Sequence, residues 1–298
     1  MKYAIGIDIG ATNTRIAIVD DQGTVVWKKT VPTVKNDLNG LVTQNSNLIN
    51  EALEIDKEII EIGIGIPGPV TPKTGFVHVL PNIGMGNFDI AKILHRRFNL
   101  PIIVMNDANA AAYGEAICGA GKGYRVVQYI TLSTGISGGL VIGGKVYTGK
   151  HGFAQEIGNM IIDPSIDKPN TSMNKGSFES WCSGSSLVRM AKNKGFAPKH
   201  AGDVFANPAC EDIINEWVNH MGMAISNMIT LYEPDVFVIG GGLIKSSHYF
   251  FDKIIEATKP YTHDGIKPHI IIKMASLGQD SGVIGAGIMA LLNKDIWF

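Results

Sequence analysis

Apolar residues at the start of the chain fall into three runs, which predict three β-strands before any helix. The runs cover 3–9, 14–19 and 24–31, and the Asp-Asp-Gln-Gly stretch at 20–23 between the last two is typical of a hairpin turn. We therefore expect the chain to open with consecutive antiparallel strands rather than with a strand–helix–strand unit.

Farther along, the spacing of apolar residues alternates between helical and extended patterns. It predicts helices at 39–53, 89–98, 108–117, 210–232 and 282–292, and strands at 58–67, 102–105, 126–132, 138–142, 236–239 and 269–274. Residues 151–184 are irregular, and a loop of that length in a compact domain usually has a function. The glycine-rich stretch 119–123 predicts a hinge. We expect a smaller α/β domain at 1–118, joined by a C-terminal helix at 281–298, and a larger α/β domain at 119–280.

The order of elements indicates a duplication. A strand, a turn of polar residues and glycine, and a second strand occur at 5–18 and recur at 129–142. Two such halves would make a phosphate clamp, because each turn directs backbone N–H groups inward. A chance recurrence in a glycine-rich chain is the alternative.

Composition and charge narrow the class of protein. The chain has 298 residues, 45% of them hydrophobic and 18% charged, which fits about two domains and excludes wholesale disorder. A net charge of −1 argues against nucleic-acid or polybasic membrane partners. No apolar run reaches the roughly 18 residues of a membrane helix, and three scattered cysteines make neither a disulfide framework nor a zinc cluster. We expect a soluble, cytoplasmic protein.

Two familiar phosphate-binding patterns occur without the context they need. Residues 63–68 fit G-x-G-x-x-G, but Pro67 and Pro69 prevent the helix that must begin there. Residues 139–145 imitate a P-loop, but Val146 stands where a Ser or Thr would hold Mg²⁺. Neither a Rossmann dehydrogenase nor a P-loop enzyme is supported.

Asp8 stands at the end of the first buried run and begins the turn at 8–12. A carboxylate there is costly unless it is solvated or paired with a cation, so it suggests a Mg²⁺ or a water-bridged phosphate site. Gly10 permits close backbone approach and Thr12 adds a hydroxyl donor. An ordinary turn that ends with an aspartate is the alternative, but the matching turn at 133–139 favours phosphate binding.

Further polar residues suggest a phosphoryl-transfer or sugar site. Asn106 and Asp107 follow a strand and precede a helix, so they are either helix caps or, for Asp107, a general base at the strand's carboxyl end. Glu156 and Glu179 lie in the irregular segment and could bind vicinal sugar hydroxyls. There are two alternatives. The glutamates are ordinary surface residues, or they are the two catalytic carboxylates of a glycosidase, which would leave both phosphate turns unused.

Together these residues resemble the ROK family (repressors, open reading frames and sugar kinases) from about residue 3 to 293. The order and spacing of the motifs carry the resemblance: Asp8-x-Gly10-Ala11-Thr12, Pro67-Gly68, Pro81-Asn82, Asn106-Asp107-Ala108-Asn109, the turn 133–139, Glu156-Ile157-Gly158, Glu179 with Ser183-Gly184, and Gly240-Gly241-Gly242. The resemblance implies an actin-like ATPase (ribonuclease H-like) α/β fold with two duplicated domains around a cleft.

The resemblance also implies an ATP-dependent hexose kinase, an ATP:sugar 6-phosphotransferase. Asp107 corresponds to the base that takes the proton from the sugar 6-hydroxyl. The implied sugar-binding positions are Gly68, Asn82, Asn106, Asp107, Glu156, Asn159 and Glu179. The implied ATP-binding positions are Asp8, Gly10, Ala11, Thr12, Ser133, Thr134, Gly135, Gly138, Gly240, Gly241 and Gly242. Mg²⁺ at Asp8, directly or through water, and a homodimer are expected with them.

The sequence departs from the family pattern where zinc would bind. Asn159 replaces the histidine that touches both sugar and zinc, so it is carried over only as a hydrogen-bonding residue. The family's C-x-C-G-x-x-G-C segment is absent, with Ser177 in the place of its last cysteine. We therefore predict no zinc site. The identity of the hexose stays open, with glucose, allose and N-acetylmannosamine among the candidates.

A sugar-binding regulator of the same family, without kinase activity, is the competing hypothesis. Family repressors carry a DNA-binding helix-turn-helix ahead of the kinase-like part, whereas here the first kinase strand is expected at Tyr3. The presence of both Asp8 and Asp107 also favours the enzyme over an inactive sugar-binding protein.

Overall fold

The computed structural model describes residues 2–55, 57–71, 73–80, 82–165, 174–292 and 297. Contacts within the chain group it into two compact units. Unit 1 comprises residues 1–125, 139–155 and 275–298, and unit 2 comprises residues 126–138 and 156–274. The domain boundaries expected from the sequence, after residue 118 and before residue 281, stay a prediction.

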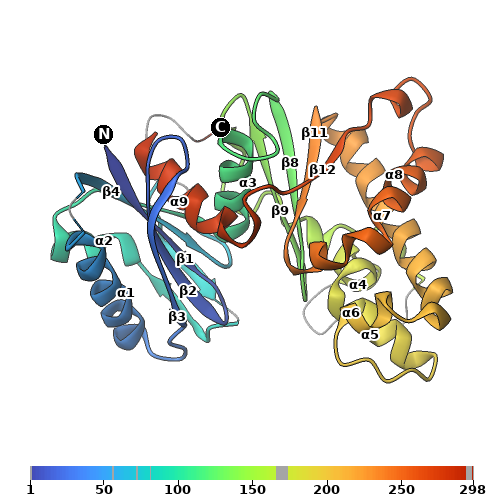
Figure 1. The fold of residues 1–298 in the computed structure, drawn as a ribbon, viewed down its shortest axis with the longest axis horizontal. Coiled ribbons are helices and arrows are strands. Elements are labelled where there is room, and N and C mark those ends of the chain that lie inside the picture. The colour runs from blue at the N-terminus through green and yellow to red at the C-terminus, as the bar shows by residue number, and fades with distance from the viewer. Residues whose placement is uncertain are drawn as a thin grey trace. The chain divides into compact units, whose positions relative to one another are not determined.

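Unit 1 is built on a five-stranded sheet with the order β3-β2-β1-β4-β7 (Figure 1). The strands are β1 (Tyr3–Ile9), β2 (Asn13–Val19), β3 (Val25–Pro32), β4 (Ile59–Ile66) and β7 (Ile102–Asn106). As predicted, β1, β2 and β3 are consecutive antiparallel strands, while β4 and β7 run parallel to β1. A separate hairpin of β5 (Val77–Leu80) and β6 (Met85–Phe88) follows β4.

The two faces of this sheet are covered by different helix pairs, because isoleucine alternates with small residues in β1 and β4. The isoleucines pack with α1 (Leu38–Leu53) and α2 (Ile90–Phe98) into one core. On the opposite face, Gly6 and Gly63 let the backbone of α9 (Ser281–Leu291) approach so closely that a Cβ at either glycine would overlap it. Helix α3 (Asp107–Ile117) lies beside α9, with Gly114 and Gly285 at their contact.

The second sheet has the order β10-β9-β8-β11-β12. Its strands are β8 (Val126–Leu132), β9 (Ile136–Ile142), β10 (Lys145–Val146), β11 (Val236–Gly240) and β12 (Ile272–Met274). In both sheets the third, second and first strands of the repeat lie next to one another in that order. The first strand is then followed by two later strands that run parallel to it. This shared order confirms the predicted duplication.

Unit 2 carries its largest core around the long helix α7 (Glu211–Tyr232). The fully buried Trp217 is central to it and meets Phe205 and Phe250 edge-on. The other helices of this unit are α4 (Phe178–Cys182), α5 (Gly184–Asn193), α6 (Ala201–Phe205) and α8 (Phe251–Thr258). Short 3₁₀ turns complete it, including Ile157–Asn159 and Gly242–Tyr249.

The predicted elements agree with the structure except at several points. Strand β9 begins two residues earlier than predicted, and the strand predicted at 269–274 is reduced to Ile272–Met274 because a 3₁₀ turn containing Pro268 precedes it. The β5–β6 hairpin and helices α4, α5, α6 and α8 were not predicted. None of the helices among the described residues is both long and apolar enough to span a membrane.

Candidate functional site

The carboxyl ends of the parallel strands in unit 1 bring Asp8 and Asp107 to one edge of the sheet. Asp8 pairs with Gly65 in the strand register, and Gly65 pairs in turn with Met105 of β7. A Cβ at Gly65 would lie 3.5 Å from the Cα of Asp107. Asp8 of β1 and Asp107 after β7 therefore flank the carboxyl end of β4.

The cation beside Asp8 in this structure is Arg15, whose Nη1 lies 3.3 Å from the Asp8 Oδ2. The two residues face each other across the β1–β2 hairpin. Burial raises the pKa of the Asp8 carboxyl more than the neighbouring guanidinium lowers it. The first turn of α9 lies against the same carboxyl, since a Cβ at Gly282 would be 3.1 Å from it. Asp8 is therefore a confined carboxylate, partly neutralised by a residue that the sequence analysis did not single out.

The turn after Asp8 is closed by its own backbone. The N–H of Gly10 donates to the Asn13 carbonyl at 3.0 Å, and the Thr33 hydroxyl donates to the Gly10 carbonyl at 2.7 Å. Ala11 is half-buried, and Thr12 is exposed at the tip of the turn. A small, braced turn with an exposed hydroxyl next to a carboxylate is suited to binding a phosphate.

Asn106 is both a helix cap and a clamp on the neighbouring loop. Its Oδ1 accepts the N–H groups of Ala108 and Asn109, and its Nδ2 donates to the Gly68 carbonyl at 3.1 Å. The capping interpretation of Asn106 is thus correct, and Asp107 is left as the first residue of α3. The Asp107 Oδ1 accepts the N–H of Ala108 at 2.8 Å, and the residue is half-buried.

Gly68 and Asn82 are the two predicted sugar-binding residues of the segment that follows β4. Gly68 has a φ of +83° and sits so close to the Val79 carbonyl in β5 that a side chain would overlap it. Only glycine meets both conditions. Asn82 is exposed in the turn that follows β5. Unit 1 therefore gathers Asp8, Gly68, Asn106 and Asp107 around the ends of β1, β4 and β7.

In unit 2 the turn between β8 and β9 is anchored from two directions. The Ser133 carbonyl accepts the Gly184 N–H at 2.8 Å, at the start of α5, and the Ile136 N–H donates to Glu179 Oε2 at 2.7 Å. Thr134 at the tip is exposed, and Gly138 already belongs to β9.

The three consecutive glycines that begin with the last residue of β11 lie near the start of this turn. Gly241, with a φ of +90°, packs onto the Leu132 carbonyl, and Gly240 packs onto the Tyr129 ring. A Cβ at Gly242 would point into open space. The predicted ATP-binding residues of unit 2 therefore share one region.

Glu156 and Glu179 form a pair of acids beside the same turn. Burial raises the pKa of both carboxyl groups, and the negative charge of Glu179 raises the pKa of Glu156 further. Gly158 packs between the Ile136 carbonyl and the Glu179 side chain, which holds the 3₁₀ turn carrying Glu156 and Asn159 against β9. Asn159 is half-buried next to the acids. The predicted sugar-binding residues of unit 2 thus adjoin its predicted phosphate turn.

Asp8 is compatible with a magnesium site of the kind that phosphate substrates complete. Mg²⁺ in such sites takes one or two carboxylates from the protein and its other ligands from phosphates and water. One confined carboxylate beside a phosphate-sized turn meets that requirement. Within the described ranges, no three His, Cys, Asp or Glu side chains are grouped closely enough to hold a metal by themselves. The absence of zinc stays a prediction, since part of the segment in question lies outside the described residues.

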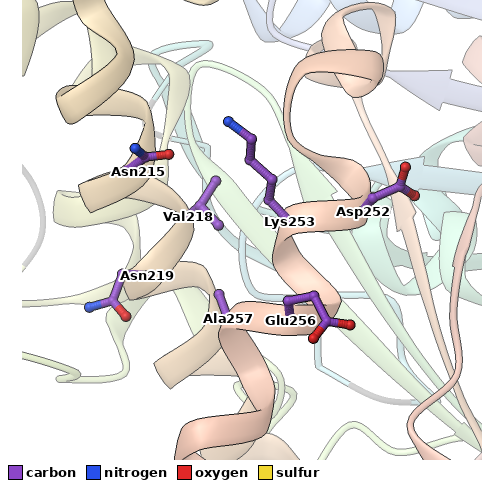
Figure 2. A pocket seen from close by; sticks show the side chains of 7 residues that line it. All are labelled: Asn215, Val218, Asn219, Asp252, Lys253, Glu256 and Ala257. Carbon is purple, nitrogen blue, oxygen red and sulfur yellow. The ribbon is translucent and has the colours of Figure 1, made fainter.

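A surface pocket of about 460 Å³ lies elsewhere in unit 2, between α7 and α8 (Figure 2). Its lining contains none of the predicted site residues and consists of Asn215, Val218, Asn219, Asp252, Lys253, Glu256 and Ala257. In Figure 2, Asp252 and Glu256 point away from α7. The lining of this pocket contains no glycine turn that could bind the phosphates of ATP.

Comparison with known proteins gives a consistent assignment. The ROK family matches residues 4–293. A glucokinase of Halalkalibacterium halodurans is 32% identical over 96% of this chain and 94% of its own length. The crystal structure of a ROK family glucokinase from Streptomyces griseus in complex with glucose and AMPPNP is 28% identical, with a TM-score of 0.82 over 97% of this chain and 99% of that one. A xylose repressor of Bacillus spizizenii is 26% identical over 95% of this chain and 75% of its own length.

The family match covers nearly all of the chain, and the fold is shared with an enzyme crystallised with sugar and a nucleotide analogue. The resemblance inferred from the sequence motifs is thereby confirmed, together with the mixed α/β, actin-like ATPase fold that it implied. This chain belongs to the ROK family.

Proposed function

We propose that this protein is an ATP-dependent hexose kinase that transfers the γ-phosphoryl group of ATP to the sugar 6-hydroxyl. The placement of Asp107 is the observation that carries the proposal. It begins α3 at the sheet edge where Asp8 and the turn at 10–12 also lie. Similarity to enzymes named glucokinase supports the same reaction class.

In the proposed reaction, Asp107 accepts the proton of the 6-hydroxyl as that oxygen bonds to the γ-phosphorus. The bond from the γ-phosphorus to the β,γ-bridging oxygen breaks, and ADP leaves. Glu156, Glu179 and Asn159 orient the sugar through its hydroxyls, while backbone N–H groups at 11–12 and 134–135 hold the phosphates. Mg²⁺, held by the phosphates and by Asp8, would neutralise charge on the transferring group.

The kinase activity and the identity of its sugar substrate are tested with a panel of hexoses and Mg-ATP, in a coupled assay of ADP release. The panel comprises glucose, mannose, allose, fructose, N-acetylmannosamine and N-acetylglucosamine. Turnover with one of them supports the proposal and names the substrate. Sugar binding without ADP release for every member of the panel would favour the regulator hypothesis instead.

The role of Asp107 is tested with Asp107→Asn. The asparagine Oδ1 can still accept the Ala108 N–H, so the start of α3 is preserved while the basic group is lost. We expect kcat to fall by a factor of about 10²–10⁴, the usual contribution of a general base, with sugar affinity retained. Asp21→Asn, in the exposed turn between β2 and β3, is the matched control. Near-normal turnover by Asp107→Asn would remove Asp107 from the mechanism.

A further inference from the structure

One hydrogen bond in unit 2 joins a predicted sugar-binding residue to the predicted phosphate turn. Glu179 Oε2 accepts the backbone N–H of Ile136 at 2.7 Å, although the two residues are 43 positions apart. A side chain at the preceding position would displace the carboxylate, because a Cβ at Gly135 would lie 2.6 Å from the same oxygen. Gly135 is not among the glycines with positive φ. Space for the carboxylate, rather than backbone conformation, therefore explains the glycine.

The main chain around Glu179 holds the same turn from its other side. The Glu179 carbonyl accepts the Ser183 N–H at 3.1 Å and the Ser186 hydroxyl at 2.7 Å, which fixes the start of α5. The start of α5 in turn donates its Gly184 N–H to Ser133, at the beginning of the turn. A displacement of Glu179 would thus be transmitted to both ends of the turn.

The carboxylate of Glu179 links this contact to the sugar. One of its oxygens, Oε2, accepts the Ile136 N–H, and its charge acts on the neighbouring Glu156. A sugar hydroxyl that donates to the same carboxylate would restrict its rotation and hold Oε2 in place. The Ile136 N–H would then be held in place with it, which orders the turn.

We propose that Glu179 couples the two ligands of unit 2: sugar bound at its carboxylate orders the turn 133–136 for the phosphates of ATP. This inference rests on the proposed kinase function. Because coupling between two binding sites is reciprocal, the nucleotide raises the affinity for sugar by the same factor. Glu179 then acts on nucleotide binding through the Ile136 N–H, beyond its contact with sugar.

The test is calorimetric titration of the full-length protein with AMPPNP and Mg²⁺, with and without a saturating concentration of the hexose that the panel identifies. In the unmodified protein we expect the sugar to lower the Kd for AMPPNP by a factor of about 5 or more, the usual range of such coupling. In Gly135→Ala the methyl group separates the turn from the carboxylate, and we expect the coupling factor, which is the ratio of the two AMPPNP Kd values, to fall to about 1.

Two further variants make the outcome specific. Glu179→Gln leaves one acceptor oxygen in place of two, so the side chain can no longer accept both the Ile136 N–H and a sugar hydroxyl. The coupling factor is therefore expected to fall even if Gly135→Ala does not fold. Gly242→Ala adds its methyl group in open space, and whatever its effect on nucleotide affinity, it leaves the coupling factor unchanged.

The failures are distinguishable. Binding of both ligands without coupling in the unmodified protein, or undiminished coupling in Gly135→Ala and Glu179→Gln, overturns this inference and leaves the kinase proposal standing. Failure of every sugar in the panel to bind overturns the kinase proposal, and this inference with it.

Discussion

Glu115 offers a sharp test of how unit 1 is held together. This glutamate of α3 is fully buried. Its carboxylate accepts three backbone N–H groups, those of Ala120, Ser276 and Leu277, at 3.0, 3.1 and 2.9 Å. The hydroxyls of Ser276 and Ser281 also donate to it, at 3.4 and 2.8 Å. The residue therefore ties α3 to the segment that leads out of unit 1 and to the one that returns into it.

Glu115→Ala would leave these donors without their acceptor. At about 1 kcal/mol for each of the three backbone N–H groups, the free energy of unfolding falls by about 3 kcal/mol, and the vacated volume adds about 1 kcal/mol. At an unfolding entropy of about 2 cal/mol/K per residue, the combined loss of about 4 kcal/mol corresponds to a decrease in Tm of about 6 °C for a chain of 298 residues. The Tm of Glu115→Gln is expected to lie between those of the unmodified protein and Glu115→Ala. The glutamine keeps one acceptor oxygen, but its amide N–H₂ group faces donors that it cannot accept.

The measurement is thermal unfolding of both variants, followed by circular dichroism. Glu58→Ala, at an exposed position before β4, is the control, and its free energy of unfolding should change by no more than about 0.5 kcal/mol. A decrease in Tm of less than about 2 °C for Glu115→Ala would refute the assignment of this carboxylate as the common acceptor.

Three other predictions follow from the site and the packing. Glu156→Gln should raise Tm at pH 8, because a carboxyl group with a raised pKa in the folded protein destabilises the fold once it is ionised. The gain in Tm should vanish below pH 4.5, the ordinary pKa of glutamate, where the group is protonated in both the folded and the unfolded state. A lower Tm for Glu156→Gln at pH 8 contradicts this prediction. Gly285→Ala should push α9 away from the Ala110 carbonyl of α3 and lower the free energy of unfolding, measured in urea, by about 1–3 kcal/mol. The control is Gly265→Ala, where the nearest neighbour of the new methyl group is 3.4 Å away, and an equal loss in both variants contradicts the prediction. Elemental analysis should find no stoichiometric zinc, and one zinc ion per chain would be the contrary result.

The first sheet could be predicted because its signals are local. Apolar runs and a hairpin turn define β1 to β3, and the alternation of isoleucine with glycine in β4 indicates a strand with one open face. The capping role of Asn106 was also accessible, since asparagine before a helix is a local preference. Arg15 could have been found the same way, because a short hairpin at 10–13 places it opposite Asp8.

Other features depend on residues far apart in sequence, and no local pattern encodes them. The hydrogen bond between Glu179 and Ile136 joins a helix to a turn 43 positions earlier in the chain. Nothing in the sequence around Gly135 indicates that the Glu179 carboxylate lies against it. The short helices α4 to α6 were missed because five to ten residues span too few helical turns for a period to be recognised against the irregular sequence around them. Their positions are fixed by packing around Trp217.

The glycine face of the first sheet has a consequence for biosynthesis. Gly6 and Gly63 are covered by α9, which is translated more than two hundred residues after them. While the ribosome is still elongating the chain, that side of β1 and β4 lacks α9 and has only α3 to cover it, even after residues 156–274 of unit 2 have emerged. Vectorial folding would thus complete the packing of the amino-terminal sheet last.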